Sequence, residues 1–121
     1  MGRAPSTANV EKHLPLKPLV FQVLLALADS ERHGWGLVRE VQQRGGFGRI
    51  MPGNFYRTLR SMLAEDLITE STGRPPSDED DERRRYFRIT PLGEAIAAAE
   101  ARRLEAAVME ARAKRLLARR G

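Results

Sequence analysis

Four arginines lie within residues 41–64, a stretch that contains no aspartate or glutamate: Arg44, Arg49, Arg57 and Arg60. A guanidinium group stays protonated at physiological pH and donates paired hydrogen bonds to phosphate oxygens or to the edge of guanine. Because no carboxylate in the stretch neutralises them, these groups create a positive field that attracts a polyanion. Nucleic acid is the commonest polyanion, so the stretch predicts a nucleic-acid contact.

The same stretch supplies a polar helix face. A helix is predicted to begin at Pro52 and to turn Phe55, Leu59 and Met62 toward a core. The other face is polar, and its alternative interpretation is an ordinary solvated surface. Tyr56 either donates its hydroxyl to a phosphate or is an aromatic residue at the edge of the core. The complete set of candidate DNA contacts is Arg44, Arg49, Asn54, Tyr56, Arg57, Thr58, Arg60, Ser61 and Arg84.

No group of residues suits catalysis or metal binding. The chain has no Cys, and His13 and His33 are its only histidines, so an ordinary structural zinc site cannot form. The acidic run 78–82 is interpreted as a solvated loop, because Arg83 stands where a calcium loop needs Gly. The glycines of residues 45–48 are not followed by the Lys of a nucleotide phosphate loop. The sequence therefore indicates neither an enzyme nor a cofactor.

The composition fits one small domain with a single hydrophobic core. The 121 residues include 21 basic and 16 acidic ones, a formal net charge of +5. The longest apolar stretch, residues 19–28, is far shorter than the roughly 20 apolar residues that span a bilayer. No secretory signal pattern opens the chain, and the absence of Cys suits a reducing compartment. We therefore expect a cytoplasmic protein that makes no membrane contact.

Hydrophobic periodicity predicts two helices before the one at residue 52. Apolar residues within 16–27 recur at spacings of three and four, which indicates an amphipathic helix with Pro18 in its first turn. A shorter helix follows, with His33 as a turn residue at its start. Residues 1–13 show no helical period and are interpreted as a flexible N-terminal arm.

Two short strands and a long helix complete the chain. Residues 67–72 and 85–90 are rich in β-branched and aromatic residues, which is typical of a hairpin. A helix of about 25 residues is then expected, with Thr90 as N-cap and Pro91 as its first residue. The fold class is mainly α with a small two-stranded β-hairpin. This is the winged helix-turn-helix arrangement, whose third helix enters the major groove, and we expect it over residues 14–90.

Residues 91–121 are expected to form a C-terminal dimerisation helix. Apolar residues recur along it at spacings of three and four, and the stripe is too long for one small domain to cover. Such a stripe indicates a homodimer. The candidate interface residues are Leu92, Ile96, Leu104, Val108 and Ala111.

Three motifs resemble the PadR family of bacterial transcriptional regulators. They are the His-Gly-aromatic turn at His33–Leu37, the helix segment Gly53–Leu59, and the strand-to-helix junction Arg85–Gly93. The resemblance covers residues 16–118. It implies double-stranded DNA as a partner, a homodimer paired through the last helix, and a small-molecule or other signal that releases the DNA. It also makes Trp35 a candidate effector contact, although packing in the core is the preferred interpretation.

Two positions depart from the family pattern. Asp66 stands where Gly usually ends the recognition helix, but Asp tolerates the left-handed conformation that such an end requires. The acidic run 78–82 is unusual for a wing beside DNA, and we expect its tip to make no groove contact.

We therefore expect a dimeric, sequence-specific DNA-binding regulator, a repressor, whose two copies read an inverted-repeat operator. The alternative is a winged-helix module that binds another protein without specific DNA binding. The acidic run is the feature that favours this alternative.

Overall fold

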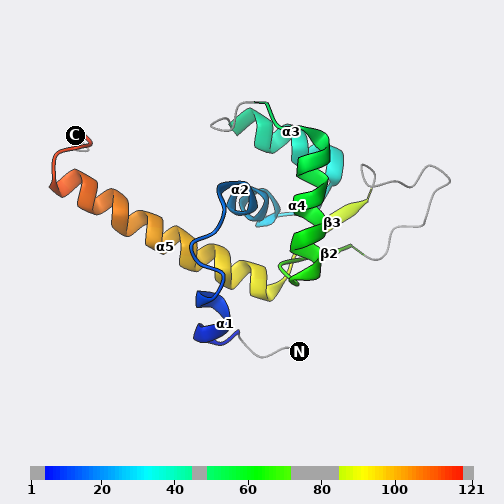
Figure 1. Cartoon of the computed structure of the whole chain (residues 1–121), viewed down its shortest axis with the longest axis horizontal. Coiled ribbons are helices and arrows are strands. Elements are labelled where there is room, and N and C mark those ends of the chain that lie inside the picture. The colour runs from blue at the N-terminus through cyan, green and yellow to red at the C-terminus, as the bar shows by residue number, and fades with distance from the viewer. Residues whose placement is uncertain (1–4, 45–48, 72–84, 119–121) are drawn as a thin grey trace.

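The computed structural model describes residues 5–44, 49–71 and 85–118. Figure 1 shows α2, α3, α4 and the strands gathered in one body, from which α5 runs outward toward the C-terminus. The fold is mainly helical with a small antiparallel sheet, which confirms the predicted fold class. The elements in chain order are α1 (Thr7–Glu11), α2 (Pro18–Leu27), β1 (Arg32–His33), α3 (Gly34–Arg44), α4 (Pro52–Ala64), β2 (Ile68–Glu70), β3 (Tyr86–Ile89) and α5 (Pro91–Ala113).

Three helices, α2, α4 and α5, begin at the positions that their first-turn prolines predicted. Pro18, Pro52 and Pro91 each occupy the first turn of a helix, where the missing N–H has no intrahelical partner to lose. Thr90 is the N-cap of α5, and its hydroxyl oxygen accepts the Gly93 N–H at 2.9 Å. These short-range signals were therefore sufficient to locate the starts of α2, α4 and α5.

The sheet has three strands, so the prediction of a two-stranded hairpin was incomplete. The order is β1-β3-β2, and both pairings are antiparallel. The added strand, β1, has two residues and aligns Arg32 with Phe87 and His33 with Tyr86. Two residues are too few to show an alternating pattern, which is why the strand was not predicted. His33 also begins the next helix, because its Nδ1 accepts the Gly36 N–H at 2.9 Å.

The N-terminal segment contains a helix where a flexible arm was expected. The Ser6 hydroxyl accepts the Asn9 N–H at 3.1 Å and so caps α1. Val10 is buried, and α1 packs against α5. A five-residue helix is too short to show a hydrophobic period. Its stability comes from the cap and from packing on an element far along the chain.

The core forms around α2, which contacts α3, α4, α5 and β3. Leu24, Leu37, Phe55 and Phe87 come from four different elements and are each at most 2% exposed. Burial of these apolar side chains is the main stabilising term for a domain of this size. One core therefore fixes the relative positions of all the helices of the winged domain.

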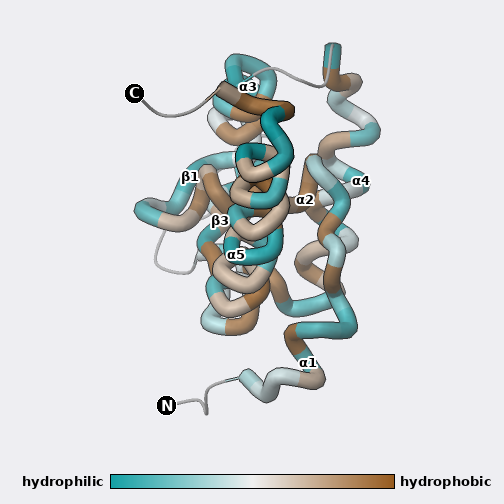
Figure 2. The backbone as a smooth tube through the Cα atoms, turned by 90° about the vertical axis from the view of Figure 1, so that its left-hand side faces the viewer, coloured by the Kyte–Doolittle hydropathy of each residue, from teal (hydrophilic) through white to brown (hydrophobic). Residues whose placement is uncertain are grey.

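Only the first half of α5 belongs to this core. Gly93, Ile96 and Glu100 are buried, whereas every residue from 101 to 110 is exposed. Figure 2 shows hydrophilic and hydrophobic residues alternating along the length of α5. Ile96 is fully buried within its own chain, so the prediction that it faces a partner was wrong. The start of the stripe packs internally because α1 and α2 both cover this half of α5.

Glu100 is a buried carboxylate at the boundary between the two halves of α5. It is 3% exposed, and both of its oxygens accept hydrogen bonds from the Arg103 guanidinium at 2.9 Å. The Arg103 guanidinium holds the pKa of the Glu100 carboxyl below its ordinary value, against the opposing effect of burial, and the Leu16 backbone N–H adds to the lowering. The carboxylate therefore ties the segment before α2 to α5.

A tight junction joins the end of α4 to the start of α5. Asp66 has a φ of 65°, which confirms the predicted left-handed end of α4. The Leu67 carbonyl oxygen accepts the Thr90 N–H at 3.1 Å and also lies 3.0 Å from the Thr90 hydroxyl. A Cβ added at Gly93 would lie 2.1 Å from that same carbonyl oxygen. Only glycine fits at this position.

We expect Gly93→Ala to destabilise the fold by about 2–3 kcal/mol, because the methyl group overlaps a backbone carbonyl that cannot move without breaking the junction. Chemical unfolding of parent and variant measures this difference. Gly53→Ala is the matched control, since a Cβ there meets nothing within 4 Å. It should be neutral or stabilising by up to about 1 kcal/mol. Equal stability of the two variants would contradict the close contact between Gly93 and the Leu67 carbonyl oxygen.

We expect Glu100→Gln to flatten the loss of stability at acid pH. A carboxyl with a lowered pKa in the folded state stabilises the fold above the pKa of the unfolded chain, about 4.3 for glutamate. That contribution is lost as the pH falls through the lower, folded-state pKa. Thermal unfolding from pH 7 down to pH 3 measures it, with Glu105→Gln as a control for losing a carboxylate of the same helix. Superimposable pH profiles for parent and Glu100→Gln would refute this assignment.

Candidate nucleic-acid interface

Helix α4 has one buried face and one exposed face. Phe55, Tyr56, Leu59 and Met62 are buried. The opposite side, which we call the outer face of α4, carries no acidic residue. It consists of Asn54, Arg57, Thr58, Arg60 and Ser61. All of these are exposed except Thr58, which is half-buried, so the structure brings together five of the predicted contacts on one surface.

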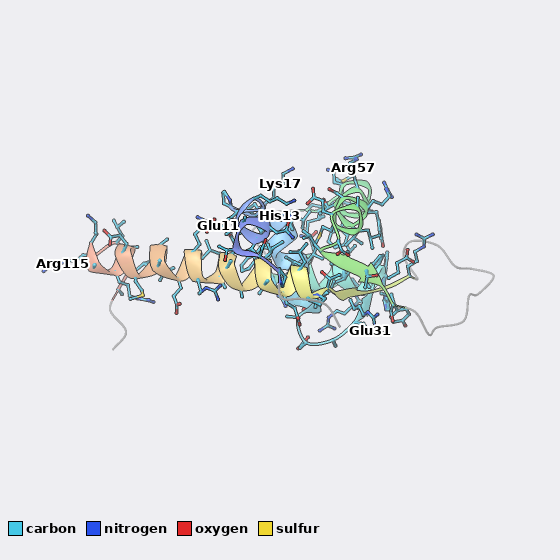
Figure 3. All side chains as sticks on the ribbon, turned by 90° about the horizontal axis from the view of Figure 1, so that it is seen from below. Glu11, His13, Lys17, Glu31, Arg57 and Arg115 are labelled. Atoms are coloured by element: carbon cyan, nitrogen blue, oxygen red, sulfur yellow. The ribbon has the colours of Figure 1, made fainter. Side chains whose placement is uncertain are left out.

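Hydrogen bonds order the first turn of this outer face. Arg57 Nη1 donates to Asn54 Oδ1 at 2.7 Å. The Thr58 hydroxyl donates to the Asn54 backbone carbonyl at 3.0 Å. Figure 3 shows the Arg57 side chain projecting away from the body of the molecule. The guanidinium is therefore accessible to a ligand while one of its nitrogens is held by the neighbouring turn.

Tyr56 does not belong to the outer face. Its hydroxyl oxygen is buried, and its ring packs edge-to-face on Phe55 with the centroids 5.9 Å apart. The prediction that this hydroxyl reaches a phosphate was wrong, and the alternative, an aromatic residue of the core, is correct. Consecutive apolar residues at positions 55 and 56 widen the buried face of the helix, a consequence that spacing alone left open.

The arginines outside α4 lie in different settings. Arg44 Nη2 lies 2.6 Å from Glu40 Oε2, and Glu40 Oε1 lies 3.0 Å from Arg32 Nε. The acid-free stretch begins just after Glu40, and the helix brings that carboxylate back to Arg44 across one turn. Arg49 is exposed, and the N–H of the next residue, Ile50, donates to Gln42 Oε1 at 2.7 Å. Arg84 and the acidic run 78–82 lie outside the described residues.

One exposed cation near α4 was missed in the sequence. Lys17 precedes α2 as its N-cap and is exposed. Figure 3 places Lys17 and Arg57 on the same side of the molecule, with Glu31 on the opposite side. Forty residues separate the two cations, so no local pattern could have joined them. Lys17 comes to the same side as Arg57 through the packing of α2 against α4.

Trp35 is not a core residue, contrary to the preferred interpretation of the sequence. It lies in the first turn of α3 and is 48% exposed. Leu37 and Val41 supply the buried face of this helix. A large aromatic side chain is therefore displayed on the surface beside the sheet.

The second half of α5 displays a row of exposed apolar side chains. Leu104 is 37% exposed, Val108 is 39% exposed and Met109 is 64% exposed. Ala111 and Leu92 are half-buried, and Leu92 packs against the core. Beyond the helix, Leu116 and Leu117 are exposed as well. We call Leu104, Val108 and Ala111 the apolar stripe of α5.

The described residues contain neither a metal-binding cluster nor a membrane-spanning helix. No three His, Asp or Glu side chains there lie close enough to share a metal ion. In the same part of the chain, no helix is long and apolar enough to cross a bilayer.

Comparison with known proteins assigns the family. The model of the Transcriptional regulator PadR-like family matches residues 23–99. Transcriptional regulator Rv3488 of Mycobacterium tuberculosis is 34% identical over 83 residues, which cover 69% of this chain and 72% of that protein.

Solved structures share the fold at lower identity. A PadR family transcription regulator from Clostridium difficile superposes with a TM-score of 0.62 at 21% identity, covering 78% of this chain and 96% of that one. Bacillus subtilis PadR in complex with operator DNA superposes with a TM-score of 0.58 at 19% identity, covering 70% and 47%. The family match runs from α2 into α5 and so includes the sheet and α4. The chain belongs to the PadR-like family of transcriptional regulators.

Proposed function

We propose that the chain is a dimeric, sequence-specific DNA-binding repressor whose two copies read an inverted-repeat operator. The observation that carries this proposal is the outer face of α4, which is exposed, ordered and free of acidic residues. An α-helix fits the major groove of B-DNA, where base edges are distinguishable. The similar Bacillus subtilis PadR was solved in complex with operator DNA, which supports the same use of the fold here.

The contacts divide by chemistry. In this proposal the groove is faced by residues that share the exposed side of α4, namely Arg57, Arg60, Asn54 and Ser61. Lys17 lies on the same side and is suited to a phosphate, because a lysine ammonium acts as a compact point charge. Phosphate contacts set register and affinity, whereas base contacts set sequence preference. We also assign Arg49 a contact with the phosphate backbone of DNA, since Arg49 is exposed just before α4.

Dimerisation through α5 is the second part of the proposal. The apolar stripe of α5 leaves large side chains in water, and burying them against a symmetry mate is favourable. Residues 14–90 then form the DNA-binding part and residues 91–121 the dimerisation part. A two-fold axis through paired α5 helices presents two copies of α4, as an inverted repeat requires.

Release by a small molecule or another signal is the third part. We assign the effector contact to Trp35, whose exposed ring offers a stacking surface for a planar ligand. The competing function, a protein-binding module, depends on the acidic run 78–82, and no described residue favours it. A mobility shift with sheared genomic DNA at stated salt, followed by selection from a random duplex pool, tests the proposal directly.

We expect Arg57→Ala and Arg60→Ala to fold normally and to bind the selected operator more weakly. Loss of a phosphate contact lowers the salt slope by about one, whereas loss of a guanine contact costs about 1–3 kcal/mol at one base position. Titrations at several salt concentrations separate the two.

Two variants control this experiment. Arg115→Ala removes the same charge at the far end of the molecule from Arg57 (Figure 3) and should leave affinity nearly unchanged. Tyr56→Phe removes the buried hydroxyl and should bind DNA like the parent. If Arg57→Ala and Arg60→Ala both bind as tightly as the parent, α4 is not the recognition helix.

We expect Leu104→Glu to weaken the dimer by about tenfold or more, because two copies of the new charge would meet near the symmetry axis among apolar side chains. Sedimentation velocity over a concentration series measures this. Ala106→Glu is the matched control, since it adds the same charge about 200° around the helix. A monomeric parent, or equal effects of the two substitutions, would overturn dimerisation through this stripe.

A further inference from the structure

Asn54 and Arg57 form a hydrogen-bonded pair at the start of α4. Asn54 is the third residue of the helix, and Arg57 lies one turn later. The pair is joined through Arg57 Nη1 and Asn54 Oδ1 at 2.7 Å. Both side chains are exposed, and no residue from 49 to 64 is acidic. The pair is therefore placed where a ligand approaching the outer face of α4 would meet it first.

The hydrogen bond changes what the asparagine can offer. A separate Asn side chain has one acceptor and one donor group, and this combination matches adenine, which accepts at N7 and donates from N6. In this structure the acceptor oxygen already faces Arg57. The groups that remain for a ligand are mainly donors, namely the Asn54 amino group and the other guanidinium N–H groups, and only the second lone pair of Asn54 Oδ1 can still accept.

A surface made mainly of donors distinguishes between base pairs. In the major groove, guanine presents two adjacent acceptors, N7 and O6. Adenine and cytosine each present an amino group there, which would meet the pair donor to donor. Thymine presents one acceptor beside a methyl group. Guanine is thus the base edge that satisfies the pair most completely.

We propose that Asn54 and Arg57 act as one unit that selects a guanine in each half-site, with Asn54 holding the Arg57 guanidinium in position. This inference rests on the proposed DNA-binding function and names the base that the site reads. Because the guanidinium is oriented before binding, less side-chain freedom is lost on contact. Thr58 supports the arrangement by bonding to the backbone carbonyl of Asn54.

Phosphate is the other acceptor that such a donor-rich surface fits. A phosphate contact strengthens binding to every sequence and steepens the salt dependence, whereas a guanine contact affects one base position. The experiment must therefore measure base preference and salt slope separately. Arg57→Lys does so, because lysine keeps the charge but lacks the planar fork that matches guanine.

The first experiment is selection from a random duplex pool with the parent chain. The same selection is then carried out with the variants Asn54→Ala, Arg57→Ala and Arg57→Lys. Arg115→Ala, at the far end of the molecule from Arg57, is the matched control. The parent should enrich a guanine at one half-site position, and replacing that guanine by adenine should cost about tenfold or more in affinity. All three variants should lose most of this preference at the same position. Arg57→Lys should keep the parent's salt slope, and Arg115→Ala should keep the preference.

Modified DNA tests the same contact without altering the protein. The analogue 7-deazaguanine lacks the N7 acceptor, so placing it at the selected position should weaken binding by the parent severalfold and leave Asn54→Ala and Arg57→Ala unaffected. The Arg57→Ala variant and the variant that combines Asn54→Ala with Arg57→Ala should lose similar amounts of the guanine preference, since the two residues act as a unit.

Four results would overturn the inference. Asn54→Ala and Arg57→Ala could change preference at different positions, which would separate the residues. They could lower affinity equally for all sequences with a smaller salt slope, which would assign the pair to phosphate. Finally, the parent could enrich a sequence in which neither variant changes the preference for any guanine. That result refutes the Asn54–Arg57 unit but leaves the proposed function standing. A parent that enriches no sequence at all refutes both.

Discussion

The carbonyl oxygen of Leu67 is the point at which the end of α4 and the start of α5 are joined. It accepts the backbone N–H of Thr90, lies beside the Thr90 hydroxyl, and rests against the Cα of Gly93. Leu67 itself follows the left-handed residue Asp66 that ends α4, and its N–H donates to the Met62 carbonyl. The last turn of α4 and the first turn of α5 are therefore tied to the same peptide unit. Their relative orientation is set by backbone geometry that side-chain rotation cannot relax.

This constraint matters because the proposed function needs two copies of α4 at a fixed separation. In a dimer paired through α5, any change in the angle between α5 and α4 would move the two recognition helices relative to the operator. The buried Glu100 adds a second tie, since it accepts hydrogen bonds from Arg103 and from the Leu16 backbone. The first half of α5 is thereby bound to the segment before α2. Its second half remains exposed and available to a partner.

Electrostatics on the surface follow from which carboxylates are paired. Glu40 lies between Arg32 and Arg44 and so neutralises a potential basic patch on α3. The outer face of α4 has no carboxylate among its own residues, and Lys17 lies on the same side of the molecule. The net charge of +5 says little about this arrangement. The field depends on where carboxylates lie beside the cations, and no carboxylate belongs to the outer face of α4.

Local signals in the sequence were enough to place the helices α2 to α5, the strands β2 and β3, and the left-handed end of α4. Proline at a first turn, a threonine cap and hydrophobic spacing act over a few residues and need no tertiary context. Tertiary structure decided the rest. The strand β1 and the helix α1 are too short to carry a period and exist through contacts with β3 and α5. Tyr56 and Ile96 were turned inward, and Trp35 outward, because burial depends on which neighbouring elements cover each helix face. The Asn54–Arg57 pair could be named from its spacing of three, but its hydrogen bond, and hence the donor-rich surface, required side-chain positions that spacing does not specify.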